Sequence, residues 1–196
     1  MKREKVLWRR VVILLLGSVV TIILLCVLGS ALTHRIRGYV YSLFLKDDPD
    51  YAAQVAHTMI DYDLPLGYRE QSAMQVKTYY TLAIIASNDH PTNLITIQPA
   101  SDLLINPEWG ERSQERAAQE IGDLRYQTHT VSVQDVLIRN QPSRLRMLEG
   151  QDEDGHDIRQ ALSAFTGKNG NVLVIIVGDI ETWDQAMIDK FLSSIY

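Results

Sequence analysis

Residues 11–32 form an uninterrupted run of 22 residues without a charged side chain. At about 1.5 Å per residue, a helix of this length spans roughly 33 Å, which is enough to cross a bilayer hydrocarbon core of about 30 Å. The glycines in the run do not argue against this, because glycine is common in transmembrane helices. The sequence therefore predicts a single transmembrane helix over residues 11–32, with the lipid bilayer as a partner of the chain.

The charges on the two sides of this run predict its orientation. Residues 1–10 carry five basic side chains and one acidic one, whereas only Arg35, Arg37 and Lys46 follow closely. The positive-inside rule places residues 1–10 in the cytoplasm and the rest of the chain on the extracytoplasmic side, whether periplasmic, extracellular or lumenal. Aromatic side chains flank the run and are predicted to lie at the membrane interface: Trp8, Tyr39, Tyr41 and Phe44.

A cleaved signal peptide is the competing interpretation of the apolar run, because Gly29 and Ala31 have the small side chains that precede a cleavage site. Signal peptides usually contain only about 7–15 apolar residues, so an uncleaved anchor is preferred. A lipoprotein is disfavoured because Leu25 precedes Cys26, where a small residue is needed. Cys26 is the single cysteine of the chain, and disulfides therefore cannot stabilise the part beyond the membrane.

The remainder of the chain is acidic. Residues 33–196 carry 14 basic and 23 acidic side chains, a formal charge of −9. Nucleic-acid binding needs clustered Lys and Arg, so nucleic acid is excluded as a partner class. Hydrophobic residues make up 46% of the whole sequence, which indicates a folded chain and not a disordered one.

Residues 33–48 are interpreted as a juxtamembrane connector and residues 49–196 as one exported domain. Asp48 and Pro49 form a helix start signal, as N-cap and first helical residue. A second helix is predicted from Asn106-Pro107 to about Gly122. A third helix follows Thr182 and Gln185, which are spaced as a capping box.

Alternating or continuous apolar segments predict strands at residues 79–87, 94–98, 129–138, 143–150, 157–167 and 171–178. The apolar run at 172–177 lacks alternation, so it should be a central strand covered on both faces. Asn169-Gly170 predicts a two-residue hairpin turn with positive φ angles. These elements predict an α+β fold, with a mainly antiparallel sheet of about six strands covered by helices on its faces.

The succession of turns and elements resembles a known family. It runs from Leu64-Pro65-Leu66-Gly67-Tyr68, through the turn that Arg139-Asn140-Gln141-Pro142-Ser143-Arg144 makes, and through Phe165-Thr166-Gly167-Lys168-Asn169-Gly170, to the helix that ends Phe191-Leu192-Ser193-Ser194-Ile195. Over about residues 60–196 this order resembles the PsbP-like α/β/α sandwich. The resemblance implies an interaction or assembly module without a catalytic site.

The sequence contains no nucleophile elbow, P-loop, dinucleotide-binding glycine pattern or paired-cysteine metal motif. Ser87, Asp89 and His90 form the single local grouping of a nucleophile with a base, but they fall in a predicted turn and are interpreted as turn residues. The sequence therefore predicts neither an enzyme nor a bound cofactor.

The segment at 152–157 (DEDGHD) is the nearest approach to a metal site. Carboxylates beside a glycine can surround Ca²⁺, which takes six to eight oxygen ligands, but the EF-hand glutamate at position twelve is missing. A solvated hairpin turn that binds no metal is the preferred interpretation of this segment.

Four arginines are the candidate contact residues for a partner or ligand: Arg139, Arg144, Arg146 and Arg159. They fall in or beside adjacent predicted strands, and arginine can bind carboxylates through two parallel hydrogen bonds. The competing interpretation is that they pair with Glu149, Asp152 and Asp157 on the solvent side of the hairpin.

Two functions from different classes follow. The first is a non-catalytic accessory or assembly subunit, anchored by one transmembrane helix among other subunits of a membrane complex. The second is an extracytoplasmic sensor or small-ligand-binding domain that uses Arg144, Arg146 or Arg159.

Overall fold

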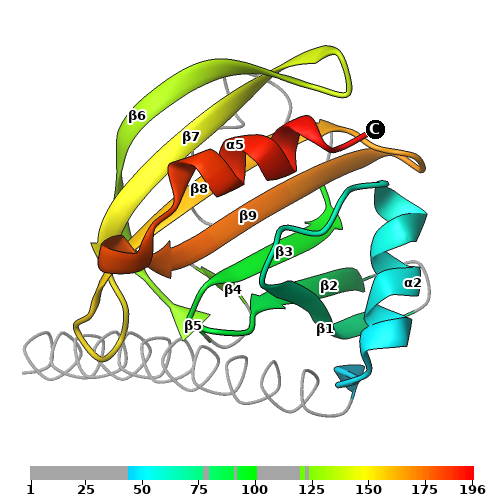
Figure 1. The fold of residues 1–196 in the computed structure, drawn as a ribbon, viewed down its shortest axis with the longest axis horizontal. Helices are drawn as coiled ribbons and strands as arrows, with labels where there is room; N and C mark the ends of the chain where they lie inside the picture. The colour runs from blue at the N-terminus through cyan, green and yellow to red at the C-terminus, as the bar shows by residue number, and fades with distance from the viewer. Residues whose placement is uncertain (1–43, 77–79, 91, 101–119, 122–123) are drawn as a thin grey trace, which may run out of the picture. The chain divides into compact units, whose positions relative to one another are not determined.

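A computed structural model describes residues 44–76, 80–90, 92–100, 120–121 and 124–196, which all belong to one compact unit (Figure 1). The predicted anchor at 11–32 lies outside the described residues, as does most of the helix predicted over 106–122. No helix within the described ranges is both long enough and apolar enough to cross a membrane.

The first described helix begins where the start signal predicts. Helix α2 (Pro49–Met59) has Asp48 as its N-cap, and the Asp48 carboxylate accepts hydrogen bonds from the main-chain N–H groups of Asp50 and Tyr51 at 3.1 and 3.2 Å. These bonds satisfy amide groups that the first helical turn leaves without a partner. The buried face of the helix consists of Ala52, Val55, Ala56 and Met59.

Seven strands form one sheet, in the order β1-β2-β3-β9-β8-β7-β6, and every neighbouring pair is antiparallel. Their bounds are Tyr68–Val76 for β1, Tyr80–Ser87 for β2, Leu94–Pro99 for β3, Gln127–Ile138 for β6, Gln141–Gln151 for β7, Asp157–Thr166 for β8 and Asn171–Asp179 for β9. The predicted α+β class and antiparallel sheet are confirmed, with one strand more than the six expected.

Strand β1 is the member of the seven-stranded sheet that the sequence does not predict. Its sequence (YREQSAMQV) has no regular alternation of apolar and polar residues, and its register with β2 shifts between Glu70 and Ser72. A bulge reverses the side-chain alternation at that point, so the periodicity of a half-buried strand is lost. Only the pairing with β2 identifies the segment as a strand.

Strand β9 is central, as predicted from its continuous apolar run. It lies between β3 and β8, and residues 172–177 are all at most 2% exposed. Val172, Val174 and Ile176 belong to the larger core cluster, and the alternate residues Leu173, Ile175 and Val177 belong to the second cluster. Both faces of the sheet therefore carry buried apolar side chains.

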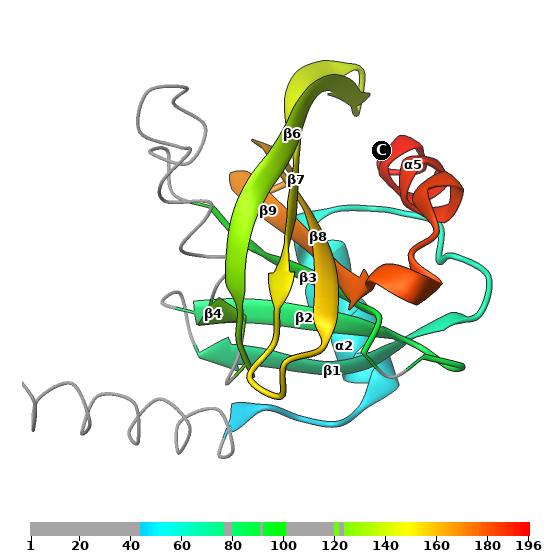
Figure 2. The same ribbon diagram turned by 90° about the vertical axis from the view of Figure 1, so that its left-hand side faces the viewer.

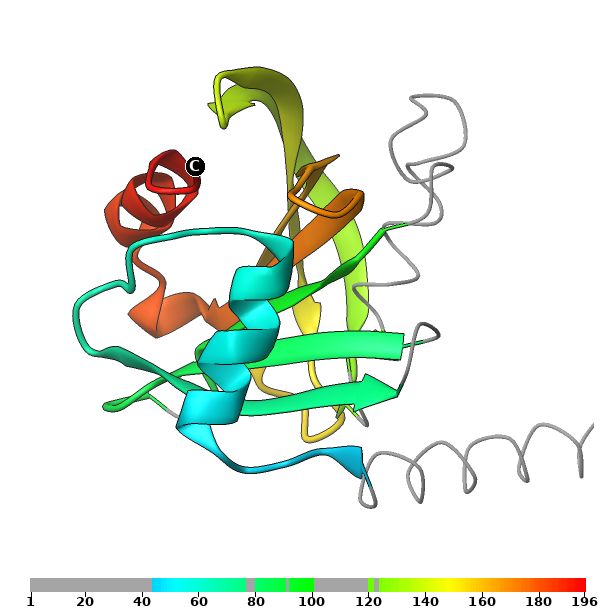
Figure 3. The ribbon, with the colours of Figure 1, turned by 90° about the vertical axis from the view of Figure 1, so that its right-hand side faces the viewer.

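Both described helices cover the same face of the sheet (Figures 2 and 3). Helix α5 (Gln185–Ser193) contributes Ile188, Phe191 and Leu192 to the larger cluster, which also contains the buried residues of α2. The prediction of helices on both faces is therefore correct for one face within the described residues. The helix predicted over residues 106–122 lies mainly outside the described residues. At its predicted end, Glu120–Ile121 forms strand β4, which pairs with β5 (Leu124–Arg125).

The capping box predicted for the last helix is wrong. Thr182 ends a 3₁₀-helix (η1, Ile180–Thr182), and the N-cap of α5 is Asp184, which accepts a hydrogen bond from the Met187 N–H at 3.0 Å. Aspartate is as good an N-cap as threonine, and its position determines where the helix begins. Phe191, Leu192 and Ile195 at this end of the chain are buried, whereas Trp183 and Met187 are only partly so.

The two-residue turn with positive φ lies at a different hairpin from the one predicted. Arg139 and Asn140 have φ values of 54° and 56° and join β6 to β7, and Gly170 has a φ of 124° in a longer connection from β8 to β9. A hairpin does lie at Asn169-Gly170 as predicted, but its connection has the four residues 167–170 and not two, and it also binds the end of α2.

That connection caps the C-terminal end of α2. The Lys168 main-chain N–H donates to the Met59 carbonyl at 2.8 Å, Lys168 Nζ donates to the His57 carbonyl at 3.0 Å, and Asn169 Nδ2 donates to the Thr58 carbonyl at 2.7 Å. These are carbonyl groups of the last helical turn, which have no partner within a helix. A hairpin more than 100 residues away therefore fixes the end of α2.

Replacing Asn169 with Ala should lower the free energy of unfolding by about 1 kcal/mol, the usual net contribution of one hydrogen bond. Urea denaturation followed by circular dichroism measures this change. Asn88→Ala is the matched control, because Asn88 is an exposed loop asparagine whose side chain makes no hydrogen bond within the described part of the chain. An equal loss in both variants would contradict the capping role.

Candidate functional site

The four candidate arginines do not form one cluster. Arg144 and Arg146 are two residues apart on β7 and so share a face of the sheet, whereas Arg159 on β8 lies opposite Glu149 on the other face. Arg139 is in the β6–β7 turn, where its Nη1 donates to the Thr166 carbonyl at 3.1 Å. The four residues lie in or beside adjacent strands. Because side chains alternate between the two faces along a strand, Arg159 lies on the face opposite to Arg144 and Arg146.

Arg159 has two close partners. Its guanidinium forms an ion pair with Glu149, with an Nε–Oε1 distance of 2.8 Å, and lies 5.8 Å from the ring centre of Trp183. The pairing with Glu149 is the one that the competing interpretation expected. The contact with Trp183 was missed, because Trp183 is 24 positions further along the sequence and nothing in the local pattern connects the two.

Arg144 and Arg146 differ in burial although they share a face. Arg146 is 5% exposed, and its Nη1 donates to Thr130 Oγ1 at 3.3 Å. The Arg144 side chain is 54% exposed, with its Nε 4.0 Å from the Asp135 carboxylate. A pair this exposed contributes at most about 1 kcal/mol to stability. Of the four candidate arginines, Arg144 is therefore the most exposed to solvent.

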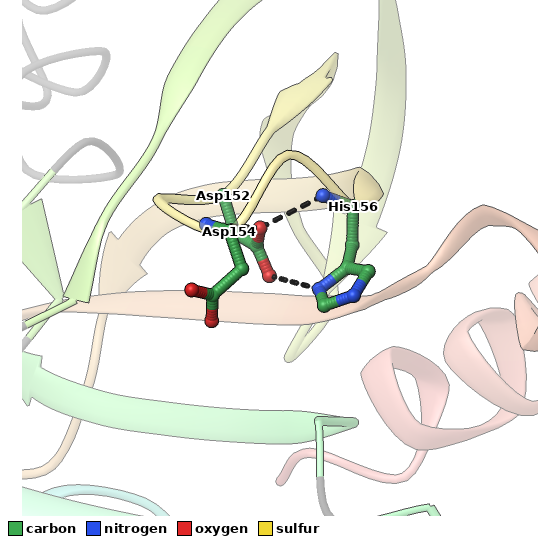
Figure 4. A group of neighbouring side chains, drawn as sticks. All are labelled: Asp152, Asp154 and His156. Carbon is green, nitrogen blue, oxygen red and sulfur yellow. Dashed lines mark hydrogen bonds and ion pairs between the residues drawn. The ribbon is translucent and has the colours of Figure 1, made fainter.

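The acidic segment forms the β7–β8 turn, where Asp152, Asp154 and His156 bring ligand atoms within 4.8 Å of one another (Figure 4). Asp152 Oδ1 accepts the main-chain N–H groups of Asp154 and His156, both at 2.9 Å, and Asp152 Oδ2 lies 3.1 Å from His156 Nδ1. Both oxygens of the most enclosed carboxylate therefore hold the turn together. The segment is therefore a hairpin turn, as predicted, and its behaviour toward metal ions stays a prediction.

The hydrogen bond that the His156 ring donates to the Asp152 carboxylate raises the pKa of His156 above its ordinary value, and the negative charge of Asp152 adds to this effect. Partial burial raises the pKa of Asp152, but the hydrogen bonds donated by His156 and Asp154 outweigh this effect, so the pKa lies below its ordinary value. The raised pKa of His156 means that its stabilising contribution is complete below about pH 6.5 and is lost as the pH rises through the folded-state value. The contribution of Asp152 is lost instead as the pH falls through its lowered pKa.

The titration of His156, followed by nuclear magnetic resonance, should therefore have its midpoint above the ordinary histidine value of about 6.5. Asp152→Asn should bring the midpoint down, because it removes the charge that favours the imidazolium ion. Asp157→Asn is the matched control, since Asp157 pairs with Gln151 and not with His156. If both variants leave the midpoint unchanged, the ion pair does not form in solution.

Ser87, Asp89 and His90 do not make a catalytic arrangement. Ser87 Oγ accepts the main-chain N–H groups of Asp89 and His90 at 3.3 and 3.2 Å, which is a turn stabilised by a serine side chain. The interpretation of these three residues as turn residues is therefore supported by their geometry.

Of the four aromatic residues predicted to lie at the membrane interface, the structure describes only Phe44. Phe44 is 45% exposed, just before Lys46 pairs with β1. Trp8, Tyr39 and Tyr41 lie outside the described residues, so their placement at a membrane interface stays a prediction.

No known protein family matches the sequence, and no curated protein sequence is significantly similar to it. Solved structures with a similar chain course include the following three. A protein of unknown function from Pseudomonas aeruginosa matches with 12% identity over 62% of this chain and 84% of its own, with a TM-score of 0.40. The immunity protein TplEi of the Pseudomonas aeruginosa T6SS, solved with a peptide, matches with 10% identity over 74% of this chain and 60% of its own, with a TM-score of 0.39.

The third is PsbP from the cyanobacterium Synechocystis sp. PCC 6803, with 11% identity over 70% of this chain and 92% of its own and a TM-score of 0.42. This match is a weak likeness of chain course to the family that the element order resembles. At these identities and scores the three structures carry no information on what this chain binds.

Proposed function

We propose that this chain is a non-catalytic accessory or assembly subunit of a membrane protein complex. In this proposal residues 11–32 anchor it and residues 49–196 form its globular part on the extracytoplasmic side. The observation that carries the proposal is that the side chains considered as catalytic or ligand-binding candidates stabilise nearby turns and strands instead. Ser87 and Asp152 hold their own turns, and Arg159 is held by Glu149 and Trp183.

The surface supplies a second line of support. Large apolar side chains are exposed at several places, including Leu66, which is 99% exposed, and Leu137, which is 68% exposed. Single exposed apolar residues are common on monomeric proteins, and contiguous groups of them mark interaction sites. Binding to another subunit would remove these side chains from water.

Affinity purification of the tagged full chain in mild detergent, followed by mass spectrometry, tests the proposal. The expected result is the same membrane proteins in repeated preparations, crosslinked to this chain before extraction. A tagged single-pass protein of unrelated sequence is the control for nonspecific capture. Recovery of the chain without any crosslinked partner would contradict an accessory or assembly role.

The proposed orientation has its own test. Protease added to intact cells, or to spheroplasts where an outer layer intervenes, should digest residues 49–196 and spare residues 1–10. Protection of the globular part would overturn the orientation. A mature chain that begins near Leu32 would overturn the uncleaved anchor.

A small-ligand-binding domain is the second candidate, and the exposure of Arg144 favours it. An accessible guanidinium can bind a carboxylate through two parallel hydrogen bonds. A dicarboxylate that raises the melting temperature of the full chain, but not that of Arg144→Gln, would support this candidate over the first.

A further inference from the structure

The connection between β8 and β9 contains the only Asn-Gly pair of the sequence, at Asn169 and Gly170. Both residues are exposed, and no atom lies within 4 Å of a Cβ atom placed at Gly170. Within the described part of the chain, the Gly170 main-chain N–H donates to no other main-chain group. Because glycine has no side chain, its main chain can also approach a neighbouring group closely. The nitrogen that follows Asn169 is therefore unhindered and accessible to water.

An unhindered nitrogen at this position can react with the side-chain amide of Asn169. The Gly170 main-chain nitrogen loses its proton and attacks Asn169 Cγ, and the new N–Cγ bond closes a five-membered succinimide ring. The side-chain nitrogen Nδ2 takes up that proton and leaves as ammonia. Water then opens the ring at one of its two carbonyl groups, which gives aspartate or isoaspartate. Water is the only co-reactant, and no group is oxidised or reduced.

The contact between Asn169 and α2 opposes this reaction. Asn169 Nδ2 donates a hydrogen bond of 2.7 Å to the Thr58 carbonyl in the last turn of the helix. The donor of this bond is the nitrogen that must leave as ammonia, so the bond must break before the reaction can finish. Reaction at Asn169 therefore requires that the connection first opens away from the end of α2.

The product of the reaction cannot restore this contact. A carboxylate accepts hydrogen bonds and does not donate them, so a carboxylate at position 169 would bring a second acceptor toward the Thr58 carbonyl. The C-terminal end of a helix carries a partial negative charge, which disfavours another negative charge there. The adjacent cation Lys168 already binds the Asp61 carboxylate at 2.5 Å and the His57 carbonyl at 3.0 Å. The new charge would therefore compete with an existing ion pair.

From these observations we propose that Asn169 is a site of spontaneous deamidation that is controlled by the end of α2. The side chain reacts when the connection opens, and the resulting carboxylate keeps the connection from closing on the helix again. The reaction thus converts a reversible opening into a permanent one. This inference goes beyond the proposed function, because it requires neither a membrane anchor nor another subunit.

Peptide mapping by mass spectrometry tests the site, with the full chain stored in mild detergent at slightly alkaline pH and sampled over time. We expect conversion of the amide to an acid at Asn169 before it occurs at Asn88 or Asn140. These two are matched internal controls, because both are exposed and both are followed by a residue with a side chain. Conversion at Asn169 that is no faster than at the controls would overturn the proposal.

The same measurement in guanidinium chloride tests the control by α2. Conversion at Asn169 should be at least about fivefold slower in the native chain than in the unfolded one, which is the factor that corresponds to one hydrogen bond. The rates at Asn88 and Asn140 provide the comparison for effects of the solvent. Equal rates at Asn169 in the native and unfolded chain would show that the contact with Thr58 does not protect it.

Asn169→Asp reproduces the aspartate product and tests its consequence. The Lys168 main-chain N–H donates to the Met59 carbonyl at 2.8 Å, so its hydrogen exchange reports whether the connection is closed on α2. Relative to its intrinsic rate, this amide should exchange at least about fivefold faster in Asn169→Asp than in the unmodified chain. Asn88→Asp is the matched control, because it adds the same charge to another exposed loop. Equal exchange of Lys168 in the two variants would overturn the proposed release of the helix end.

Discussion

Phe191→Ala is expected to lower the free energy of unfolding by about 3–5 kcal/mol, the usual cost of removing a buried phenylalanine ring. Phe191 is 1% exposed and belongs to the core cluster that joins α5, α2 and the sheet. Its ring also makes an edge-to-face contact with Tyr62, with 5.8 Å between the ring centres. The substitution therefore leaves a cavity at the point where the last helix packs on the remainder of the protein.

Urea denaturation of the full chain, followed by circular dichroism, measures this loss. Leu66→Ala is the control, and it should change stability by no more than about 0.5 kcal/mol, since surface substitutions rarely do more. A loss of about 4 kcal/mol approaches the whole stability of many domains. Little or no loss in Phe191→Ala would mean that α5 does not pack on the sheet as described.

Gly150→Ala is expected to have the next largest effect, a loss of about 3 kcal/mol, at the upper end of the usual cost of overpacking. A Cβ atom at position 150 would lie 1.9 Å from the Gln127 carbonyl oxygen and 2.7 Å from the Thr128 Cα atom. Both are main-chain atoms of the neighbouring strand β6, and they cannot move aside as the end of a side chain can. The first part of β6 must therefore separate from β7.

Gly155→Ala is the matched control, because no atom lies within 4 Å of a Cβ there, although its φ of 84° favours glycine. A residue in that left-handed conformation costs roughly 1–2 kcal/mol, so the control should lose less than Gly150→Ala. Equal losses in the two variants would show that conformational freedom, and not close strand contact, decides the cost at position 150.

The β6–β7 hairpin links stability to the proposed roles of the chain. It carries Arg144, the candidate arginine most open to a ligand. Gly150→Ala should loosen the beginning of β6 and leave residues 132–138 paired to β7 over their own register. Ligand binding at Arg144 and the stability of the sheet can therefore be measured separately.

The geometry of the turns shows where sequence reasoning succeeds and where it fails. Asp48 and Pro49 define the start of α2 correctly, because a cap acts on amide groups only two or three residues away. Asn169-Gly170 has the same kind of local signal, and a hairpin does lie there, but its connection has four residues and not the two predicted. Lys168 and Asn169 bind carbonyl groups at the end of α2, and a partner so distant in sequence leaves no mark on the local pattern.

The candidate arginines show the same division. The sequence places Arg144, Arg146 and Arg159 in adjacent strands, but the face on which each side chain lies depends on the register between the strands. That register separates Arg159 from the other two and gives it Glu149 and Trp183 as partners. It also leaves Arg144 exposed while Arg146, two residues away, is buried.

The sequence by itself determined the α+β class, the antiparallel sheet, the start of α2 and the burial of β9, because these depend on periodicity and on contacts between near neighbours. Only the tertiary structure decided that β1 is a strand, that α5 begins after Asp184, and that β6 is the open edge of the sheet. Each of these depends on pairing or packing between distant segments. Their energies come from contacts that form only when the whole chain has folded, so a local pattern cannot specify them.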